Sequence, residues 1–179
     1  MKRIFIVLAF SILVLNVQKA SAQAYDGKGD KKILLGYANT RGYSAAQFKY
    51  EGGNSNLISM GLAMTYFFIK EDSTYIGTDD GLAKILDRSE IDIFMNFHLN
   101  KPLHLDDRSD VYIGPFISLQ TTGIQAGYKY NFSERFGAYA EVSQGIYNIF
   151  KFVNESNSKS STYDTRTLFS AGITFNFLR

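Results

Sequence analysis

Residues 57–68 read LISMGLAMTYFF, and this stretch decides the fold class. Bulky side chains fall at every second position (Ile58, Met60, Leu62, Met64, Tyr66 and Phe68), and small ones fall between them (Ser59, Gly61, Ala63 and Thr65). Successive side chains of a β-strand point to opposite faces, whereas an α-helix repeats every 3.6 residues. The stretch therefore predicts a β-strand with one bulky, apolar face and one small face.

The same alternation recurs along the chain and predicts strands at 31–39, 43–51, 56–69, 89–99, 110–119, 122–132, 135–145 and 166–178. Most connections between them are short and rich in Gly, Asn and Ser, but 70–88 and 146–166 are long and polar. Pro115 cannot donate to a strand ladder, so it predicts a weak point or a bulge in the fifth strand. We expect an all-β fold, a single closed antiparallel up-and-down transmembrane β-barrel of about eight strands.

The first residues have the pattern of a secretory signal peptide. Lys2 and Arg3 precede an apolar run at 4–17, and Ala20-Ser21-Ala22 follows as a small-residue cleavage site. The run is shorter than the roughly 20 residues that a membrane helix needs, although an uncleaved N-terminal anchor is the alternative. We expect a signal peptide at 1–22, an N-terminal linker at 23–30 and the barrel at 31–179, with the mature chain beginning near Gln23.

Composition excludes several classes of function. Removing the signal peptide takes away three basic residues and no acid, which leaves 16 basic and 17 acidic residues and no basic run for nucleic acid. The chain has no cysteine, which excludes disulfides and thiolate chemistry, and only two histidines. We expect no metal and no cofactor. After the signal peptide no apolar run reaches 18 residues, so a membrane location would require a closed barrel or surface binding.

Alternation alone fits both a membrane barrel, with its apolar face outward, and a soluble carrier barrel, with its apolar face inward. The mostly small polar face suits a narrow lumen, and the bulky face is rich in the chain's 27 Phe and Tyr residues. With the N-terminus in the periplasm, strand parity places 70–88 and 146–166 outside, where we expect protease sensitivity on intact cells. The turn at 100–109 then lies inside. These features favour the membrane barrel, and the soluble barrel remains the alternative.

Charged and polar residues on the small face are candidate lumen residues, because lysine facing lipid at mid-depth costs about 2–4 kcal/mol. They are Asp92, Asn96, His98, Tyr112, Gln125, Lys129, Tyr139 and Glu141. Tight hairpins would set Tyr112 opposite Lys129 and Tyr139 beside it, with Glu141 within diagonal reach only. We expect both phenol oxygens to accept hydrogen bonds from the Lys129 ammonium. A gated pore and a plugged, hydrogen-bonded interior are the two interpretations of these charges.

Two further groups have both a chemical and a structural interpretation. His98 is either a general base or a hydrogen-bonded lumen residue, and the chain has no Gly-x-Ser-x-Gly motif to accompany a base. His104 lies in an inner turn and is expected to be solvated. The acidic groups Asp72, Asp79–Asp80 and Asp106–Asp107 with Asp110 lack the alternating carboxylates of a calcium loop, so we expect them to be solvated.

The cleavage site, the hairpin NFSERFGAYAE at 131–141 and the final strand GITFNF at 172–177 resemble the small outer-membrane β-barrel (porin-like) families of Gram-negative bacteria. Family barrels usually end on the aromatic residue, whereas Leu178 and Arg179 follow Phe177 here. The resemblance implies an outer-membrane address after export. The partners it implies are outer-membrane lipid with lipopolysaccharide, the barrel-assembly machinery and an unknown extracellular ligand, but no nucleic acid.

Three functions are compatible with this address. The first is a non-enzymatic barrel with a structural or surface-interaction role through its long outer loops. The second is a narrow porin-like channel for small solutes. The third is a lipid-modifying enzyme, which would require His98 as its base.

Overall fold

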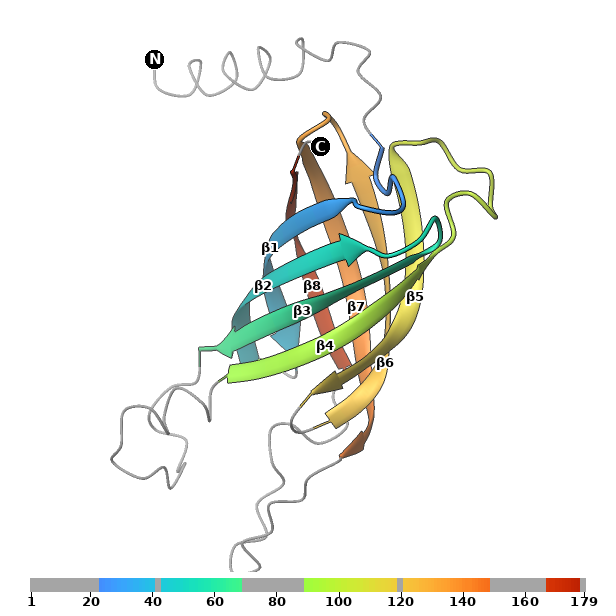
Figure 1. Ribbon diagram of the computed structural model, residues 1–179. Helices are drawn as coiled ribbons and strands as arrows, with labels where there is room; N and C mark the ends of the chain where they lie inside the picture. Colours follow the sequence, from blue (N-terminus) through green and yellow to red (C-terminus); the bar gives the residue numbers. More distant parts are fainter. Residues whose placement is uncertain (1–22, 41–42, 69–88, 119–120, 149–166, 178–179) are drawn as a thin grey trace, which may run out of the picture.

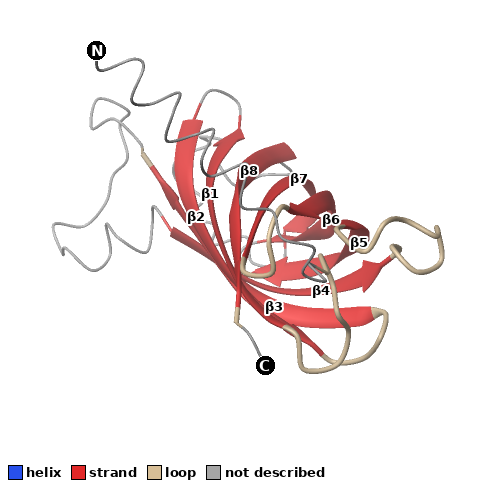
Figure 2. Cartoon of the chain, turned by 90° about the horizontal axis from the view of Figure 1, so that it is seen from above, coloured by secondary structure: helices blue, strands red, loops and turns tan. Residues whose placement is uncertain are grey.

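The computed structural model describes residues 23–40, 43–68, 89–118, 121–148 and 167–177. Its strands are β1 (Lys31–Thr40), β2 (Tyr43–Gly53), β3 (Ile58–Phe67), β4 (Ser89–His98), β5 (Ser109–Ser118), β6 (Thr121–Asn131), β7 (Phe136–Asn148) and β8 (Thr167–Asn176). Each strand pairs antiparallel with its neighbours in the sequence, and β8 pairs with β1 to close the barrel (Figures 1 and 2). The predicted all-β, up-and-down barrel is confirmed.

The observed strands begin and end within three residues of the ranges predicted from alternation. The predicted signal peptide at 1–22 lies outside the described residues. Among the residues described, no helix is long and apolar enough to span a membrane.

The two faces of the barrel wall have opposite polarity. Exposed residues on the outward faces of six strands include Leu35, Phe48, Met60, Leu62, Ile93, Ile113 and Ile173. Buried residues include Lys32, Lys49, Glu51, Asn96, Asp110 and Lys129, which point into the lumen. The barrel therefore keeps its charges inside and presents apolar side chains outside.

Pro115 interrupts one ladder without changing its register. β4 and β5 pair from Asp92↔Ser118 to Phe94↔Phe116, and again at Phe97↔Ile113 in the same register. The missing pairs lie beside Pro115, which has no N–H to donate. Within the described strands, the pairing register shifts once, at Thr122/Gly123 between β6 and β7.

Two glycines make room for large side chains in the lumen. A Cβ on Gly36 would lie 2.2 Å from the Tyr139 hydroxyl oxygen, and one on Gly127 would lie 2.3 Å from the Tyr112 hydroxyl oxygen. Neither distance is compatible with a side chain larger than hydrogen. The hydroxyl end of each phenol therefore lies against a glycine, on the neighbouring strand for Tyr112 and two strands away for Tyr139.

One end of the barrel, here called the turn end, carries the short connections at 54–57, 99–108 and 132–135. Residues 23–30, expected as an N-terminal linker, form no strand and lie across this end (Figure 1, blue). We call these residues the N-terminal strap. Ala24 and Tyr25 of the strap are buried. At the opposite end, here called the far end, a small apolar cluster of Ala38, Ala45, Phe67 and Leu168 lies inside the wall.

Candidate functional site

The polar lumen is the candidate site, and the residues expected to face it lie there. Asn96, His98, Tyr112, Gln125, Lys129, Tyr139 and Glu141 are buried, and Asp92 is partly buried. Most of them bond to residues on strands that are not their neighbours in the sheet. Such contacts cross the lumen rather than run along the wall.

A middle layer of the lumen is centred on a buried ion pair. The Lys49 ammonium lies 2.6 Å from Glu141 Oε2 and 2.7 Å from Oε1, joining β2 to β7. The Tyr112 hydroxyl donates to Glu141 at 2.8 Å, and Lys49 also donates to Gln125 at 3.3 Å. Gln125 in turn donates to Asn96 at 2.7 Å. The layer thus connects strands on opposite sides of the barrel.

Two further predicted residues line the lumen beside this layer. The Tyr139 hydroxyl donates to Gln47 at 3.1 Å, and Gln47 donates to Thr65. Asp92 lines a cavity of about 20 Å³, together with Lys49 and Glu141. A cavity of this volume holds about one water molecule.

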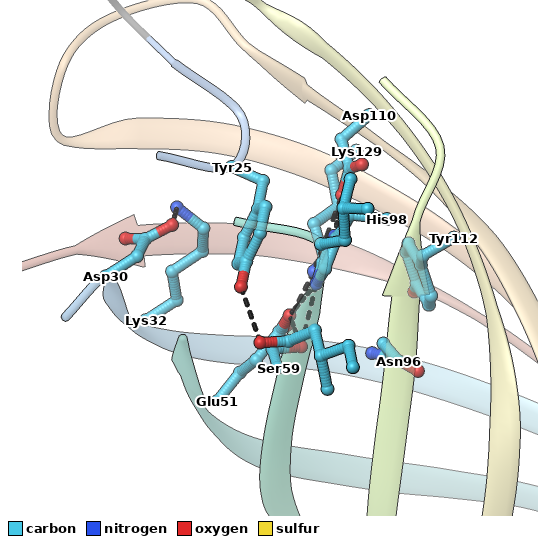
Figure 3. Close-up of polar contacts among 12 residues, drawn as sticks. Tyr25, Asp30, Lys32, Glu51, Ser59, Asn96, His98, Asp110, Tyr112 and Lys129 are labelled. Atoms are coloured by element: carbon cyan, nitrogen blue, oxygen red, sulfur yellow. Dashed lines mark hydrogen bonds and ion pairs between the residues drawn. The ribbon is translucent and has the colours of Figure 1, made fainter. Parts of the chain in front are cut away.

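A second cluster lies at the turn end of the lumen (Figure 3). His98 Nδ1 is 2.6 Å from Asp110 Oδ2, and His98 Nε2 is 2.8 Å from Ser59 Oγ. Glu51 lies beside this group, 2.6 Å from Ser59 and 2.5 Å from the Lys129 ammonium. We call these five residues the turn-end cluster. Ser59, His98 and Asp110 are in the order of a hydrolase triad, from nucleophile to base to acid.

The direction of the hydrogen bonds differs from that of a hydrolase. Ser59 has one hydroxyl proton, which it donates to Glu51. Its oxygen is then left as an acceptor 2.8 Å from His98 Nε2, whereas the serine of a hydrolase donates its proton to the histidine. On the other side, His98 Nδ1 lies 2.6 Å from Asp110 Oδ2.

A family model matches residues 14–177, which is most of the chain. The chain belongs to this family, described as a family of unknown function (DUF6646). No curated protein matches the chain. The fold is similar to the crystal structure of the N-terminal β-barrel domain of Pseudomonas aeruginosa OprF, with a TM-score of 0.55 and 12% identity over 85% of this chain and 100% of that one. At this identity the likeness concerns the fold alone.

The predicted partners of Lys129 were wrong in detail. Lys129 is opposite Asp110 rather than Tyr112, because the turn between β5 and β6 is centred one residue earlier than predicted. This shifts the pairing by two residues and sets Tyr112 opposite Gly127. Tyr139 is opposite Lys129. Neither phenol accepts from the ammonium: Tyr112 donates to Glu141, Tyr139 donates to Gln47, and the ammonium itself donates to Glu51. Lys129 instead pairs with Glu51 and lies 4.4 Å from the centre of the Tyr112 ring.

Asp110 corrects a second prediction. It was expected to be solvated, but it is fully buried against His98, because it is the second residue of β5 and its side chain points inward. Asp106 and Asp107, in the preceding turn, are exposed as expected, and so is His104. Asp72, Asp79, Asp80 and residues 70–88 lie outside the described residues, as does most of the second long loop, 149–166.

Several lumen residues were missed by the sequence analysis. They are Tyr25, Gln47, Lys49, Glu51 and Ser59. Four of these lie in the small or polar phase of β2 and β3, where the same alternation that identified Lys129 applies. Tyr25 lies outside every strand, and the only signal is an aromatic residue beside two glycines, Gly27 and Gly29.

The lumen charges do not assemble a metal site. In the described part of the chain, no group of three or more His, Asp or Glu side chains has a geometry that could hold a metal ion. Lys49 and Lys129 instead act as the internal cations, each within 2.7 Å of a carboxylate oxygen. This arrangement can cross-link the wall and fill the lumen.

Proposed function

We propose that this chain is an integral outer-membrane β-barrel protein with a closed lumen, acting without catalysis as a structural or surface-interaction protein through its long outer loops. The observation that carries the proposal is the inverted polarity of the wall, with charged side chains buried and large apolar side chains exposed. Water favours the opposite arrangement, and a hydrocarbon solvent favours this one.

The outward face supports the membrane address. Leu62, Ile93 and Ile173 are each more than half exposed, near the middle of three different strands. Exposed apolar area of this extent is unusual for a soluble monomer and normal for a barrel wall in lipid. The likeness of the fold to the OprF barrel domain supports the same address.

The filled lumen supports a role other than transport. The Lys49–Glu141 pair and the Lys129–Glu51 pair each span the lumen, and the cavity between described residues holds about one water molecule. Solute passage would require breaking buried, multiply bonded ion pairs. The long connections outside the described residues then remain as the parts available to contact other molecules.

The hydrogen-bond directions around His98 support a non-enzymatic role. Ser59 is fully buried and donates its proton to Glu51, so it is neither accessible nor activated. A serine-directed fluorophosphonate probe should leave Ser59 unmodified in the folded protein. Modification of Ser59 that is lost in His98→Ala would instead show an active triad and contradict the proposal.

The address is tested by fractionating the native host, or an expressing Gram-negative cell, and following the chain on gels. We expect it in the outer-membrane fraction, with a mobility that changes on heating because a folded barrel resists detergent. A soluble periplasmic product whose mobility does not depend on heating would exclude the membrane barrel. It would favour the soluble carrier barrel.

A narrow channel is the alternative function, and one observation favours it. The lumen is lined by charges and contains a small cavity at Asp92, Lys49 and Glu141, with room for about one water molecule. Planar-bilayer recording separates the two functions. We expect the wild-type chain to give no steady current, and a steady single-channel current that changes in Lys49→Met would establish the channel.

A further inference from the structure

The N-terminal strap lies over the turn-end cluster. The Tyr25 ring stacks on the His98 ring with their centroids 3.4 Å apart and their planes at 6° (Figure 3). The Tyr25 hydroxyl lies 2.7 Å from the carbonyl oxygens of both Ser55 and Ile58 and shares its one proton between them. Burial, followed by the nearby carboxylates, raises the pKa of Tyr25, so the hydroxyl remains a neutral donor. Tyr25 thus separates His98 from the solvent at this end.

The strap is anchored at three places on the barrel, namely the 99–108 turn and the ends of β6 and β2. Ala24 N–H donates to the Asp107 carbonyl at 2.7 Å, and Asn131 donates to the Gln23 carbonyl at 2.7 Å. Near its other end, Gly29 N–H donates to the Gly53 carbonyl at 2.9 Å. The strap therefore reaches across the whole turn end, from the 99–108 turn to the end of β2.

None of these contacts belongs to the ladders that hold the barrel strands together. The eight strand pairings close the barrel without the strap. Beneath Tyr25 lie charged and hydroxyl groups, which water can solvate at little cost once the strap leaves. Release of the strap would therefore leave the barrel wall intact. It would expose to solvent the polar groups of the turn-end cluster and the ring of Tyr25.

The seated strap also leaves polar atoms without partners. Asn100 Oδ1 and Asp110 Oδ1 are buried at this end and have no hydrogen-bond partner. The Asn100 amide nitrogen donates to the Tyr25 carbonyl oxygen over a long distance of 3.5 Å. A buried acceptor without a donor opposes the closed state, because water would satisfy it in the open state.

The backbone of the strap contains the bends that a hinged segment requires. Gly27 and Gly29 have φ angles of 91° and 86°, which L side chains rarely adopt. Gly53 allows the strap to approach β2 closely, since a Cβ there would lie 1.9 Å from the Gly27 carbonyl oxygen. Two glycines thus provide the bends of the strap, and a third allows its close approach to β2.

We propose that residues 23–30 form a releasable plug, which closes the turn end when Tyr25 is seated on His98 and opens the turn-end cluster to solvent when it leaves. Release exposes His98, Ser59 and Glu51 on that side of the barrel while the eight strands stay paired. The plug goes beyond the proposed function, which concerns the membrane address and the closed lumen.

The chain's two histidines provide the test. The full-length folded protein is treated with diethyl pyrocarbonate, and modification of each histidine is measured by mass spectrometry of its peptides. His104 is exposed and serves as the internal reference for His98. We expect His104 to react at once and His98 slowly. Tyr25→Ala should speed the modification of His98 at least tenfold and leave His104 unchanged. Equal His98 rates in the two proteins would overturn the plug.

Release, as opposed to a fixed cover, is tested by urea below the concentration that unfolds the barrel. We expect His98 in the wild-type chain to become reactive while the heat-modifiable band still reports a folded barrel. Reactivity that rises only with global unfolding would overturn release. These outcomes do not depend on the cellular address, so they fail separately from the proposed function.

A milder variant and a second probe cover the case in which Tyr25→Ala does not fold. Tyr25→Phe keeps the stacked ring but loses the hydroxyl bonds to Ser55 and Ile58, and should give an intermediate His98 rate. Because the chain has no cysteine, Ser59→Cys can be followed with a small methanethiosulfonate reagent. Its labelling should rise with Tyr25→Phe, whereas Thr65→Cys, buried toward the far end, should stay unlabelled. Equal labelling of the two cysteines would contradict the plug.

Discussion

The Lys49 ammonium and the Glu141 carboxylate form a two-pronged ion pair across the lumen, at 2.6 Å and 2.7 Å from its two oxygens. The two residues are on β2 and β7, which are not paired in the sheet. The Tyr112 hydroxyl donates to the same carboxylate. The pair therefore ties together strands that backbone hydrogen bonds leave unconnected.

Replacing Lys49 with Met should leave Glu141 as a buried charge without its cation. Removing one partner of a buried pair costs about 3–5 kcal/mol, so we expect the free energy of unfolding to fall by about that amount. Urea titration of the barrel refolded in lipid vesicles, followed by gel mobility, measures the change.

The double variant Lys49→Met, Glu141→Gln should regain most of this loss, because no uncompensated charge remains. Lys101→Met, in the exposed 99–108 turn, is the matched control and should change stability by less than about 0.5 kcal/mol. A double variant no more stable than Lys49→Met alone would show that the pair is not the source of the loss.

A glycine substitution tests how the lumen aromatics are seated. Gly36→Ala places a Cβ 2.2 Å from the Tyr139 hydroxyl oxygen and should cost about 1–3 kcal/mol through overpacking. Gly52→Ala is the control, since the nearest atom, the Met60 carbonyl oxygen, would be 3.9 Å away. Adding Tyr139→Phe to Gly36→Ala removes the closest contact and should recover part of the loss. Equal effects of the two alanine variants in urea titration would refute the close packing.

Alternation was sufficient to predict the strands, the faces and the inward position of Lys129. It could not set the register of β5 and β6, because a shift by two residues keeps every side chain on the same face. Lys129 therefore faced the lumen in both the predicted and the observed pairing, and only its opposite residue changed from Tyr112 to Asp110. Local pattern thus determines the face of a side chain but not its partner.

The cross-lumen contacts were beyond sequence reasoning for a related reason. Lys49 meets Glu141, and Lys129 meets Glu51, only after the stagger of all eight strands has accumulated around the closed barrel. Each residue could be placed in the polar phase by itself. The buried position of Tyr25 depends on loop geometry set by Gly27 and Gly29, which no periodicity describes.

The start of the mature chain is a further prediction. Cleavage after Ala22 would make Gln23 the first residue, directly before Ala24 and Tyr25 of the strap. Mass spectrometry of the protein purified from outer membranes should therefore give an N-terminal peptide beginning at or near Gln23. An intact Met1 would contradict signal cleavage, restore three positive charges and favour the anchored alternative.

A single lysine on the outer face distinguishes lipid from water as the solvent of the wall. Leu62 lies near the middle of β3, is 52% exposed and is paired with the outward-facing Tyr50 and Ile93. In a membrane, Leu62→Lys should lower the free energy of unfolding by about 2–4 kcal/mol, because the ammonium loses its hydration at mid-depth. In a soluble barrel the same change would be close to neutral, because the ammonium would remain in water.

Leu103→Lys is the matched control, since Leu103 is 54% exposed but lies in the 99–108 turn beyond the strands, where both solvents predict little change. In urea titrations in vesicles, the free energies of unfolding of the two variants should therefore differ by at least about 2 kcal/mol. Equal, small losses in both variants would favour the soluble barrel.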